Sequence, residues 1–275
     1  MVELSERDAT GEVAEIFAEL RELWGVPYVS AIHRYLGAQP GFLEWAWGVV
    51  EPAFRSGEGQ EAGWRCACGL SIGKIETIPG DALRIWGVDE RGLEAIKVAT
   101  DGFMRVAPVN MIFAGLVKAL LEGHGPGGNT LAAKAWLPPA ALPAPLPMIN
   151  AGDLGSAERT ILDSFATEME GRLFVPGLYR ILMHWPSFAA HLSVSLRPRL
   201  RSAESECAYA ELRRRIDEAV PVILMRLPAK PIRHAAPGAA QRAKFFAVWE
   251  TYRQTSPELV VAGRAIRDAL PDHLG

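Results

Sequence analysis

Apolar positions recur along most of the chain with a helical period. An i, i+3, i+4, i+7 spacing predicts a first amphipathic helix after Thr10, a residue type favoured at N-caps, through Val13, Ile16, Phe17, Leu20 and Leu23. A counterpart is predicted through Ile161, Phe165 and Met169, and further helices over 29–36, 42–50, 93–104, 109–121, 178–183, 188–196, 209–220, 239–255 and 259–270. Sustained alternation of apolar and polar residues is absent, so the sequence predicts an all-α protein.

The chain also repeats itself once. Val26-Pro27 recurs as Val175-Pro176, and at an offset of 146 the set Pro52, Arg55 and Ser56 recurs as Pro198, Arg201 and Ser202. Between the copies lies a Gly- and Pro-rich segment, which cannot sustain a helix or a central strand. We therefore expect two tandem helical repeats over 1–122 and 157–275, joined by a long linker over 123–156. The repeats are expected to pack as a pseudo-dimer with a pocket at their junction.

Composition excludes several classes of protein. The 275 residues carry a net charge of −3, which gives no broad attraction for nucleic acid or for a membrane surface. Apolar runs such as Ala219 to Met225 are shorter than the roughly 20 residues of a membrane-spanning helix. The acidic, polar N-terminus is unlike a secretory signal, and three cysteines favour reduced thiols. We expect a cytoplasmic protein, monomeric or homodimeric, without a nucleic-acid or membrane partner.

The sequence contains only incomplete matches to cofactor-binding and metal-binding motifs. Gly123-x-Gly125-x-x-Gly128 has the spacing of a dinucleotide fingerprint, but Pro126 and the prolines after it exclude the strand, turn and helix that this mechanism needs. Cys66-x-Cys68 lacks the second pair of a zinc site, so we interpret both as small buried residues. The six histidines lack paired metal-ligand spacing. We therefore expect no cofactor and no metal.

Several short patterns carry a family resemblance. They are Val26-Pro27-Tyr28-Val29, Arg34-x-Leu36, Pro40-Gly41-Phe42-Leu43, Ala46-Trp47 and Leu182-x-x-Trp185-Pro186. Together they resemble the group I 2-haloacid dehalogenases, over nearly the whole chain and including the linker. The Val-Pro start is also similar to helical proteins of the carboxymuconolactone decarboxylase and alkylhydroperoxidase-D type, which lack this tandem length.

The resemblance implies an all-α fold of two related repeats and hydrolysis of both enantiomers of 2-haloacids by direct attack of water on the α-carbon. This chemistry needs a carboxylate base, an amide that orients the water and an apolar cradle for the halide.

Carried over by position, the family's catalytic residues are replaced in this chain. Leu178 stands in place of the aspartate, Gly177 in place of its serine neighbour, and Ala107 in place of the water-orienting asparagine. Tyr28 and Ala31 replace a pocket tryptophan and phenylalanine. Because leucine and alanine neither accept a proton nor orient water, the family mechanism is not expected here. The predicted pocket residues are Tyr28, Ala31, Ala107, Gly177, Leu178 and Tyr179.

Other residues could supply the missing chemistry. Asn110 lies one helical turn beyond Ala107, where it could hold a water or a polar ligand group. His33 is our predicted replacement base, because neutral imidazole is a competent base near pH 7. The alternatives for this role are Tyr28, His184, Asp101 and Glu258.

Two functions of different classes remain open. The first is a hydrolase that adds water directly to a carbon of a halide, an epoxide or an aziridine, with Tyr28 or Tyr179 as proton donor where the leaving group needs one. The second is a protein that binds or sequesters a small molecule, for self-protection, after losing the reaction. A scaffold for protein interactions is a third reading.

Overall fold

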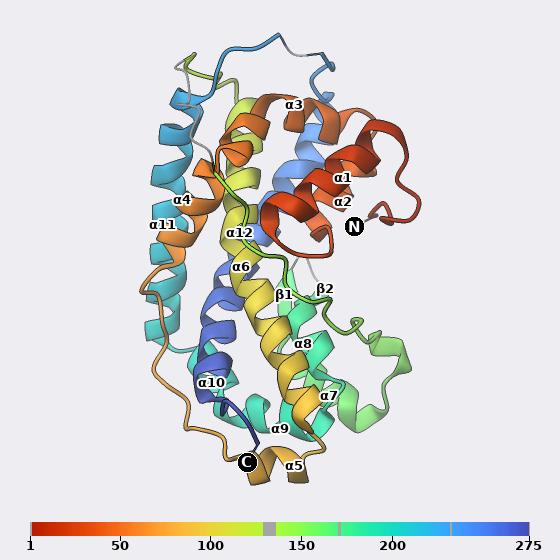
Figure 1. Ribbon diagram of the computed structural model, residues 1–275, viewed down its shortest axis with the longest axis vertical. Coiled ribbons are helices and arrows are strands. Elements are labelled where there is room, and N and C mark those ends of the chain that lie inside the picture. The colour runs from red at the N-terminus through yellow and green to blue at the C-terminus, as the bar shows by residue number, and fades with distance from the viewer. Residues whose placement is uncertain (1, 129–135, 170–171, 232, 275) are drawn as a thin grey trace. The chain divides into compact units, whose positions relative to one another are not determined.

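The protein is mostly helical. Its structure, a computed structural model, describes residues 2–128, 136–169, 172–231 and 233–274 (Figure 1). Within these ranges there are twelve α-helices, one short 3-10 helix and one pair of short strands. The prediction of a helical fold is confirmed. The repeat boundaries, the linker and the pocket at their junction stay predictions, and residues 129–135 of the predicted linker lie outside the described residues.

The chain forms two compact units. The first contains residues 1–68, 108–143 and 213–253, and the second contains residues 69–107, 144–212 and 254–275. The division falls inside three long helices: α6 (Glu90–Leu121), α11 (Ala203–Arg226) and α12 (Ala239–Ala269). Each unit therefore draws on both halves of the chain, whereas the predicted repeats divide the sequence.

The first unit begins with four helices in which α3 packs against the other three. They are α1 (Gly11–Trp24), α2 (Ala31–Gly37), α3 (Phe42–Arg55) and α4 (Glu58–Ala67). Helix α1 buries the predicted apolar stripe and ends at Gly25, whose φ of 60° lies in the left-handed region that glycine tolerates. Thr10 is the N-cap residue by position, but its side chain forms no cap hydrogen bond.

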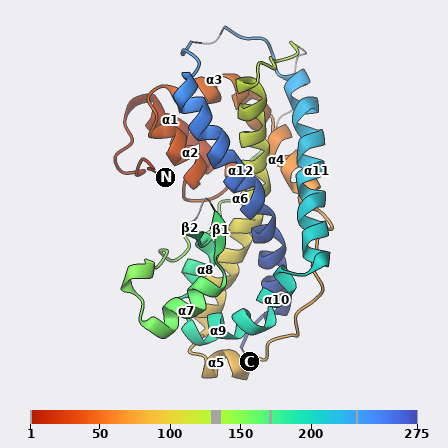
Figure 2. The same cartoon turned by 180° about the vertical axis from the view of Figure 1, so that it is seen from behind.

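The second unit contains the shorter elements, among which α9 packs against α7, α8 and α10. The elements are α5 (Gly80–Ile85), the 3-10 helix η1 (Ala151–Asp153), α7 (Ser156–Ser164), β1 (Thr167–Met169), β2 (Arg172–Phe174), α8 (Gly177–Leu182), α9 (Pro186–Ser195) and α10 (Arg197–Leu200). The two strands pair antiparallel, with Thr167 opposite Phe174 (Figure 2). The prediction that Met169 continues the helix of Ile161 is therefore wrong, because α7 ends at Ser164 and the chain turns into the hairpin.

Internal prolines do not interrupt the long helices. Pro108 lies inside α6, Pro221 inside α11 and Pro257 inside α12. Each proline removes one backbone hydrogen bond, yet apolar residues on both sides of Pro108 are buried, and α12 buries Trp249 before Pro257 and Val260 after it. Burial of these apolar faces keeps each helix continuous, so the predicted pairs 93–104 with 109–121, and 239–255 with 259–270, each form one helix.

Helix α6 has the length and composition of a membrane-spanning helix. However, 72% of its most apolar 18-residue window is buried inside the protein. Core helices of globular domains pass the same test, so length and composition alone are weak grounds for a membrane span.

The three cysteines are free. Cys66 is buried as predicted, but Cys68 is exposed because helix α4 ends at Ala67 and the chain leaves the helical packing there. Cys207 is also exposed.

Candidate functional site

The predicted site residues are divided between the two compact units. Tyr28, Ala31, His33 and Asn110 belong to the first unit. Ala107, Gly177, Leu178 and Tyr179 belong to the second. Each unit contains one group of buried polar side chains, and each group is described below by itself.

In the first unit, His33 and Asn110 share Trp24 as a neighbour. The indole Nε1 of Trp24 donates a hydrogen bond to Oδ1 of Asn110 at 2.9 Å. The His33 ring stands edge-on to Trp24, with ring centroids 5.3 Å apart, and lies 4.5 Å from the ring of Phe113. The side chains of His33 and Asn110 are buried, at 1% and 4% exposure. The two predicted catalytic residues therefore belong to one aromatic cluster.

The surroundings of His33 make it a weak base. Burial, and to a smaller extent the positive charge of Arg34, lower the pKa of His33 to about 3. Within the described ranges, neither ring nitrogen has a hydrogen-bond partner. A general base that takes a proton from water at neutral pH needs a pKa closer to 7. The geometry therefore favours another residue for that role, and the catalytic role of His33 stays a prediction.

In the second unit, a buried tyrosine and a buried carboxylate form a direct pair. The Tyr179 hydroxyl donates a hydrogen bond to Oε1 of Glu258 at 2.7 Å. The ring of Tyr179 stacks on Phe165 with centroids 4.3 Å apart and an interplanar angle of 13°, which fixes the direction of the hydroxyl. Tyr179 is 1% exposed and Glu258 is 7% exposed. Glu258 follows Pro257 inside α12, and Tyr179 follows Leu178 inside α8.

Burial dominates the electrostatics of this pair. It raises the pKa of the Glu258 carboxyl above its usual value, although the hydrogen bond from Tyr179 and the charges of Arg201 and Arg197 oppose this shift. Burial and the neighbouring Glu258 also raise the pKa of Tyr179 well above that of a free phenol. The carboxyl is thus a stronger base than an exposed glutamate, and the tyrosine keeps its proton.

The residues around the pair are held by backbone carbonyls. Arg197 donates to the carbonyl of Ser164, and Arg201 donates to the carbonyl of Ala166 at 2.9 Å. The Tyr209 hydroxyl donates to the carbonyl of Leu200 at 3.0 Å. The arginine contacts hold α10 against the end of α7, and the Tyr209 hydrogen bond holds α11 against α10.

The positions at which the resemblance implies catalytic residues are apolar and enclosed. Leu178 is fully buried and Ala107 is 4% exposed. At Gly177, a Cβ atom would lie 2.6 Å from Cε of Met148 and 3.0 Å from the ring of Phe103. The space that a serine side chain would need is therefore occupied by these two residues.

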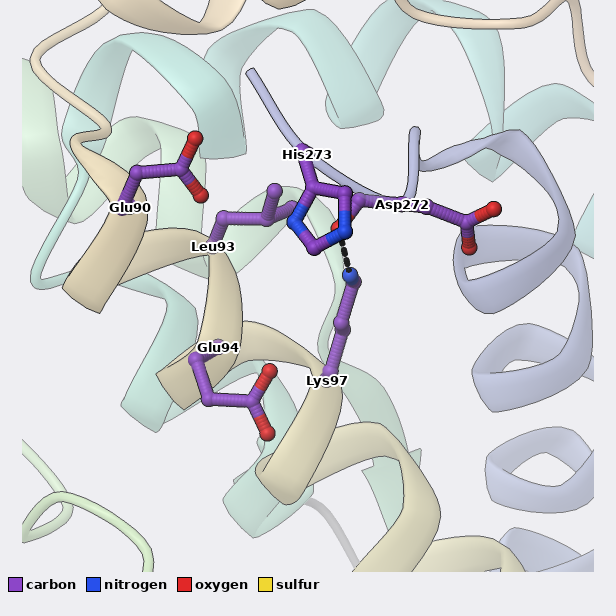
Figure 3. Close-up of a pocket in the computed structure, with 6 residues that line it drawn as sticks. All are labelled: Glu90, Leu93, Glu94, Lys97, Asp272 and His273. Atoms are coloured by element: carbon purple, nitrogen blue, oxygen red, sulfur yellow. Dashed lines mark hydrogen bonds between the residues drawn. The ribbon is translucent and has the colours of Figure 1, made fainter. Parts of the chain in front are cut away.

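A surface pocket lies elsewhere in the second unit (Figure 3). It has a volume of about 380 Å³ and is lined by Glu90, Leu93, Glu94, Lys97, Asp272 and His273. The Lys97 ammonium crosses it to donate to the backbone carbonyl of Asp272 at 2.6 Å. None of the predicted site residues lines this pocket. The residues that the structure describes contain no group of three or more His, Cys, Asp or Glu side chains placed to hold a metal ion.

Sequence reasoning included Glu258 only as one of several alternative bases. The signal available in the sequence was an acidic residue next to a proline inside a helix, and this signal does not identify the hydrogen-bond partner of Glu258. Tyr179 precedes Glu258 by 79 residues, so only the folded chain pairs them.

Comparison with known proteins places the fold among dehalogenases. No family model matches the chain. An (R)-2-haloacid dehalogenase from Pseudomonas putida is 26% identical over 201 residues, which span 70% of this chain and 66% of that relative's length. A solved structure of a D-2-haloacid dehalogenase mutant in complex with D-2-CPA superposes with a TM-score of 0.73 at 19% identity, covering 98% of this chain and 95% of that chain. A D-2-haloacid dehalogenase in complex with L-LA gives a TM-score of 0.72 at 20% identity over 98% and 96% of the two chains. The sequence match and the shared fold together support a haloacid-dehalogenase-like scaffold for this chain.

Proposed function

We propose that this protein is a dehalogenase-like hydrolase that adds water to a carbon atom of a small electrophilic organic molecule, with Glu258 as the general base. The observation that carries this proposal is the buried Tyr179–Glu258 pair, in which Tyr179 directly follows the position of the family's aspartate. The pair supplies, from α12, a carboxylate that the sequence lacks at Leu178.

The step uses the two oxygens of the Glu258 carboxylate differently. Oε1 accepts the hydrogen bond from Tyr179, while Oε2 accepts none from the described residues and can take a proton from water. The water oxygen forms a bond to the carbon as the bond to the leaving group breaks, and the leaving group keeps the electron pair. For a halide the products are an alcohol, a halide ion and a proton on Glu258, which is then released to solvent. Burial strengthens the carboxylate as a base, and Arg197 and Arg201 favour its ionised form.

The proposed activity differs from standard 2-haloacid hydrolysis in the origin of the base. Leu178 and Ala107 cannot take a proton from water or orient it, so the reaction depends on a carboxylate from another helix. A changed base position implies a changed substrate orientation, which is why we propose a small electrophile other than the usual 2-haloacid as the preferred substrate.

A second candidate function is binding without reaction. The specific observation in its favour is that Leu178 and Ala107 are both buried and apolar, at the positions where the resemblance implies an aspartate and an asparagine. A protein that sequesters an apolar small molecule would keep such a surface and would need no base.

Turnover in labelled water distinguishes the two functions. The purified protein is incubated in H₂¹⁸O with D- and L-2-chloropropionate, an epoxide panel and an aziridine panel, and halide release and label uptake are followed by mass spectrometry. We expect labelled product from at least one panel. Replacing the base, Glu258→Gln, should lower kcat by about 10²- to 10⁴-fold, the usual contribution of general base catalysis.

The matched control is Asp101→Asn, because Asp101 is a half-buried carboxylate of the same unit whose pKa burial also raises. It should keep the wild-type kcat. Wild-type turnover by the Glu258→Gln variant would refute the assignment of the base. Binding of panel compounds in calorimetry without label uptake would instead favour the sequestering protein.

A further inference from the structure

We propose that Tyr179 is the acid that protonates the leaving atom. The preferred substrates of this enzyme are then three-membered cyclic ethers, which need such an acid, rather than halides. This inference rests on the proposed function and deepens it, because it names the substrate class from the partner of the proposed base.

The leaving group decides whether an acid is needed. A halide leaves as a stable anion, so a base for water is sufficient. Opening an epoxide releases an alkoxide, which is a far stronger base than a carboxylate or a phenolate and must be protonated as it forms. A site built only for halides therefore needs a carboxylate and an apolar cradle, and does not need an acid.

The structure places one hydroxyl on the proposed base and holds it there. The Tyr179 oxygen lies 2.7 Å from Oε1 of Glu258, both side chains are buried, and the stack on Phe165 fixes the phenol ring. Tyr28, the other proton donor predicted from the sequence, belongs to the first compact unit and is only partly buried. The pair thus supplies a base and an acid, the two groups that water addition to a cyclic ether uses.

The proton balance closes within this pair. Water gives a proton to Glu258 while its oxygen bonds to the ring carbon, the ring carbon–oxygen bond breaks, and the ring oxygen takes the proton of Tyr179. The Glu258 carboxylic acid then returns a proton to the tyrosinate across their hydrogen bond. The sum is cyclic ether plus water giving a diol, with no net release of acid. Hydrolysis of a halide by the same base releases one proton for each turnover.

Two small acids that differ in the leaving group test the assignment. Glycidate carries an epoxide and 2-chloropropionate carries a halide, and kcat and KM are measured for both with the wild type and with Tyr179→Phe. We expect the wild type to convert glycidate to a labelled diol without acid release in a pH-stat. Removing the hydroxyl should lower kcat for glycidate by about 10²-fold or more, and should lower kcat for 2-chloropropionate far less.

The control variant is Tyr209→Phe, which removes a buried hydroxyl of the same unit that donates to the carbonyl of Leu200. It should leave the ratio of the two kcat values unchanged. Equal losses on both substrates in Tyr179→Phe would mean that Tyr179 only positions Glu258, and would overturn the inference.

A second measurement keeps the test valid if Tyr179→Phe does not fold. Incorporating 3,5-difluorotyrosine at position 179 preserves the ring and the hydroxyl but makes the phenol more acidic. Because the phenol is then a stronger acid, kcat for glycidate should change while kcat for 2-chloropropionate stays the same. A wild type that hydrolyses 2-chloropropionate but none of the epoxides would overturn this inference and leave the proposed function intact, whereas no turnover of any panel compound would remove both.

Discussion

Mild acid should destabilise this protein by a measurable amount at His33, in addition to what other groups contribute. Its ring is buried between Trp24 and Phe113, and neither ring nitrogen has a partner among the residues that the structure describes. Protonation would place an unpaired positive charge there, next to the positive charge of Arg34, so burial lowers its pKa from 6.5 to about 3. Between these two pH values the unfolded chain binds a proton that the folded chain does not bind, so the free energy of unfolding rises with pH in this window.

The size of this loss of stability follows from the shift in the pKa of His33. Each pKa unit corresponds to about 1.4 kcal/mol, so His33 should remove about 2 kcal/mol from the free energy of unfolding between pH 7 and pH 5. The loss should reach about 5 kcal/mol below pH 3, where both states are protonated. Glu258 acts in the opposite direction, because a raised carboxyl pKa favours the folded state as the pH falls. Glu258 is present in both the wild type and the His33 variant, so comparing the two at the same pH cancels its contribution.

Urea unfolding followed by far-UV circular dichroism at several pH values measures the contribution. His33→Phe keeps an aromatic ring in the cluster and removes the titrating group, so its stability should fall less between pH 7 and pH 5 than that of the wild type, by about 2 kcal/mol. His124→Gln is the matched control, because His124 is exposed and should leave the wild-type dependence unchanged. Parallel curves for wild type and His33→Phe would refute the reasoning.

Two further predictions concern the packing of glycines and the hydrogen bond of Lys97. Gly63→Ala should lower the free energy of unfolding by about 1–3 kcal/mol, because its Cβ would lie 3.0 Å from the backbone of Pro108. Gly48→Ala should raise the free energy of unfolding by about 0.5–1 kcal/mol, because Gly48 lies in the open, exposed middle of α3. Urea titration measures both, and a stabilised Gly63→Ala would contradict the close approach. Lys97→Met removes the donor to the Asp272 carbonyl, so the C-terminal amides should exchange hydrogen faster by mass spectrometry. Unchanged exchange would show that this bond does not hold the segment.

The sequence specified most helices through local properties. The apolar period of α1 requires only that one face be buried, and Gly25 ends the helix because glycine tolerates positive φ. Local rules failed where packing outweighed them. Prolines predict breaks near 108 and 257, yet buried apolar residues on both sides keep α6 and α12 continuous. The hairpin of β1 and β2 was missed because three-residue strands are too short to show an alternating pattern.

The same distinction between local properties and tertiary packing applies to the candidate site. The sequence by itself determined that Leu178 and Ala107 stand where the resemblance implies an aspartate and an asparagine, and that Tyr179 is available as a proton donor. Only the tertiary structure decided which acid accompanies it, because the hydrogen bond to Glu258 joins residues from different helices. It also decided that His33 is a weak base. Residue type specifies which protons a side chain can exchange, but burial and neighbouring charges set its pKa, and these exist only after the chain has folded.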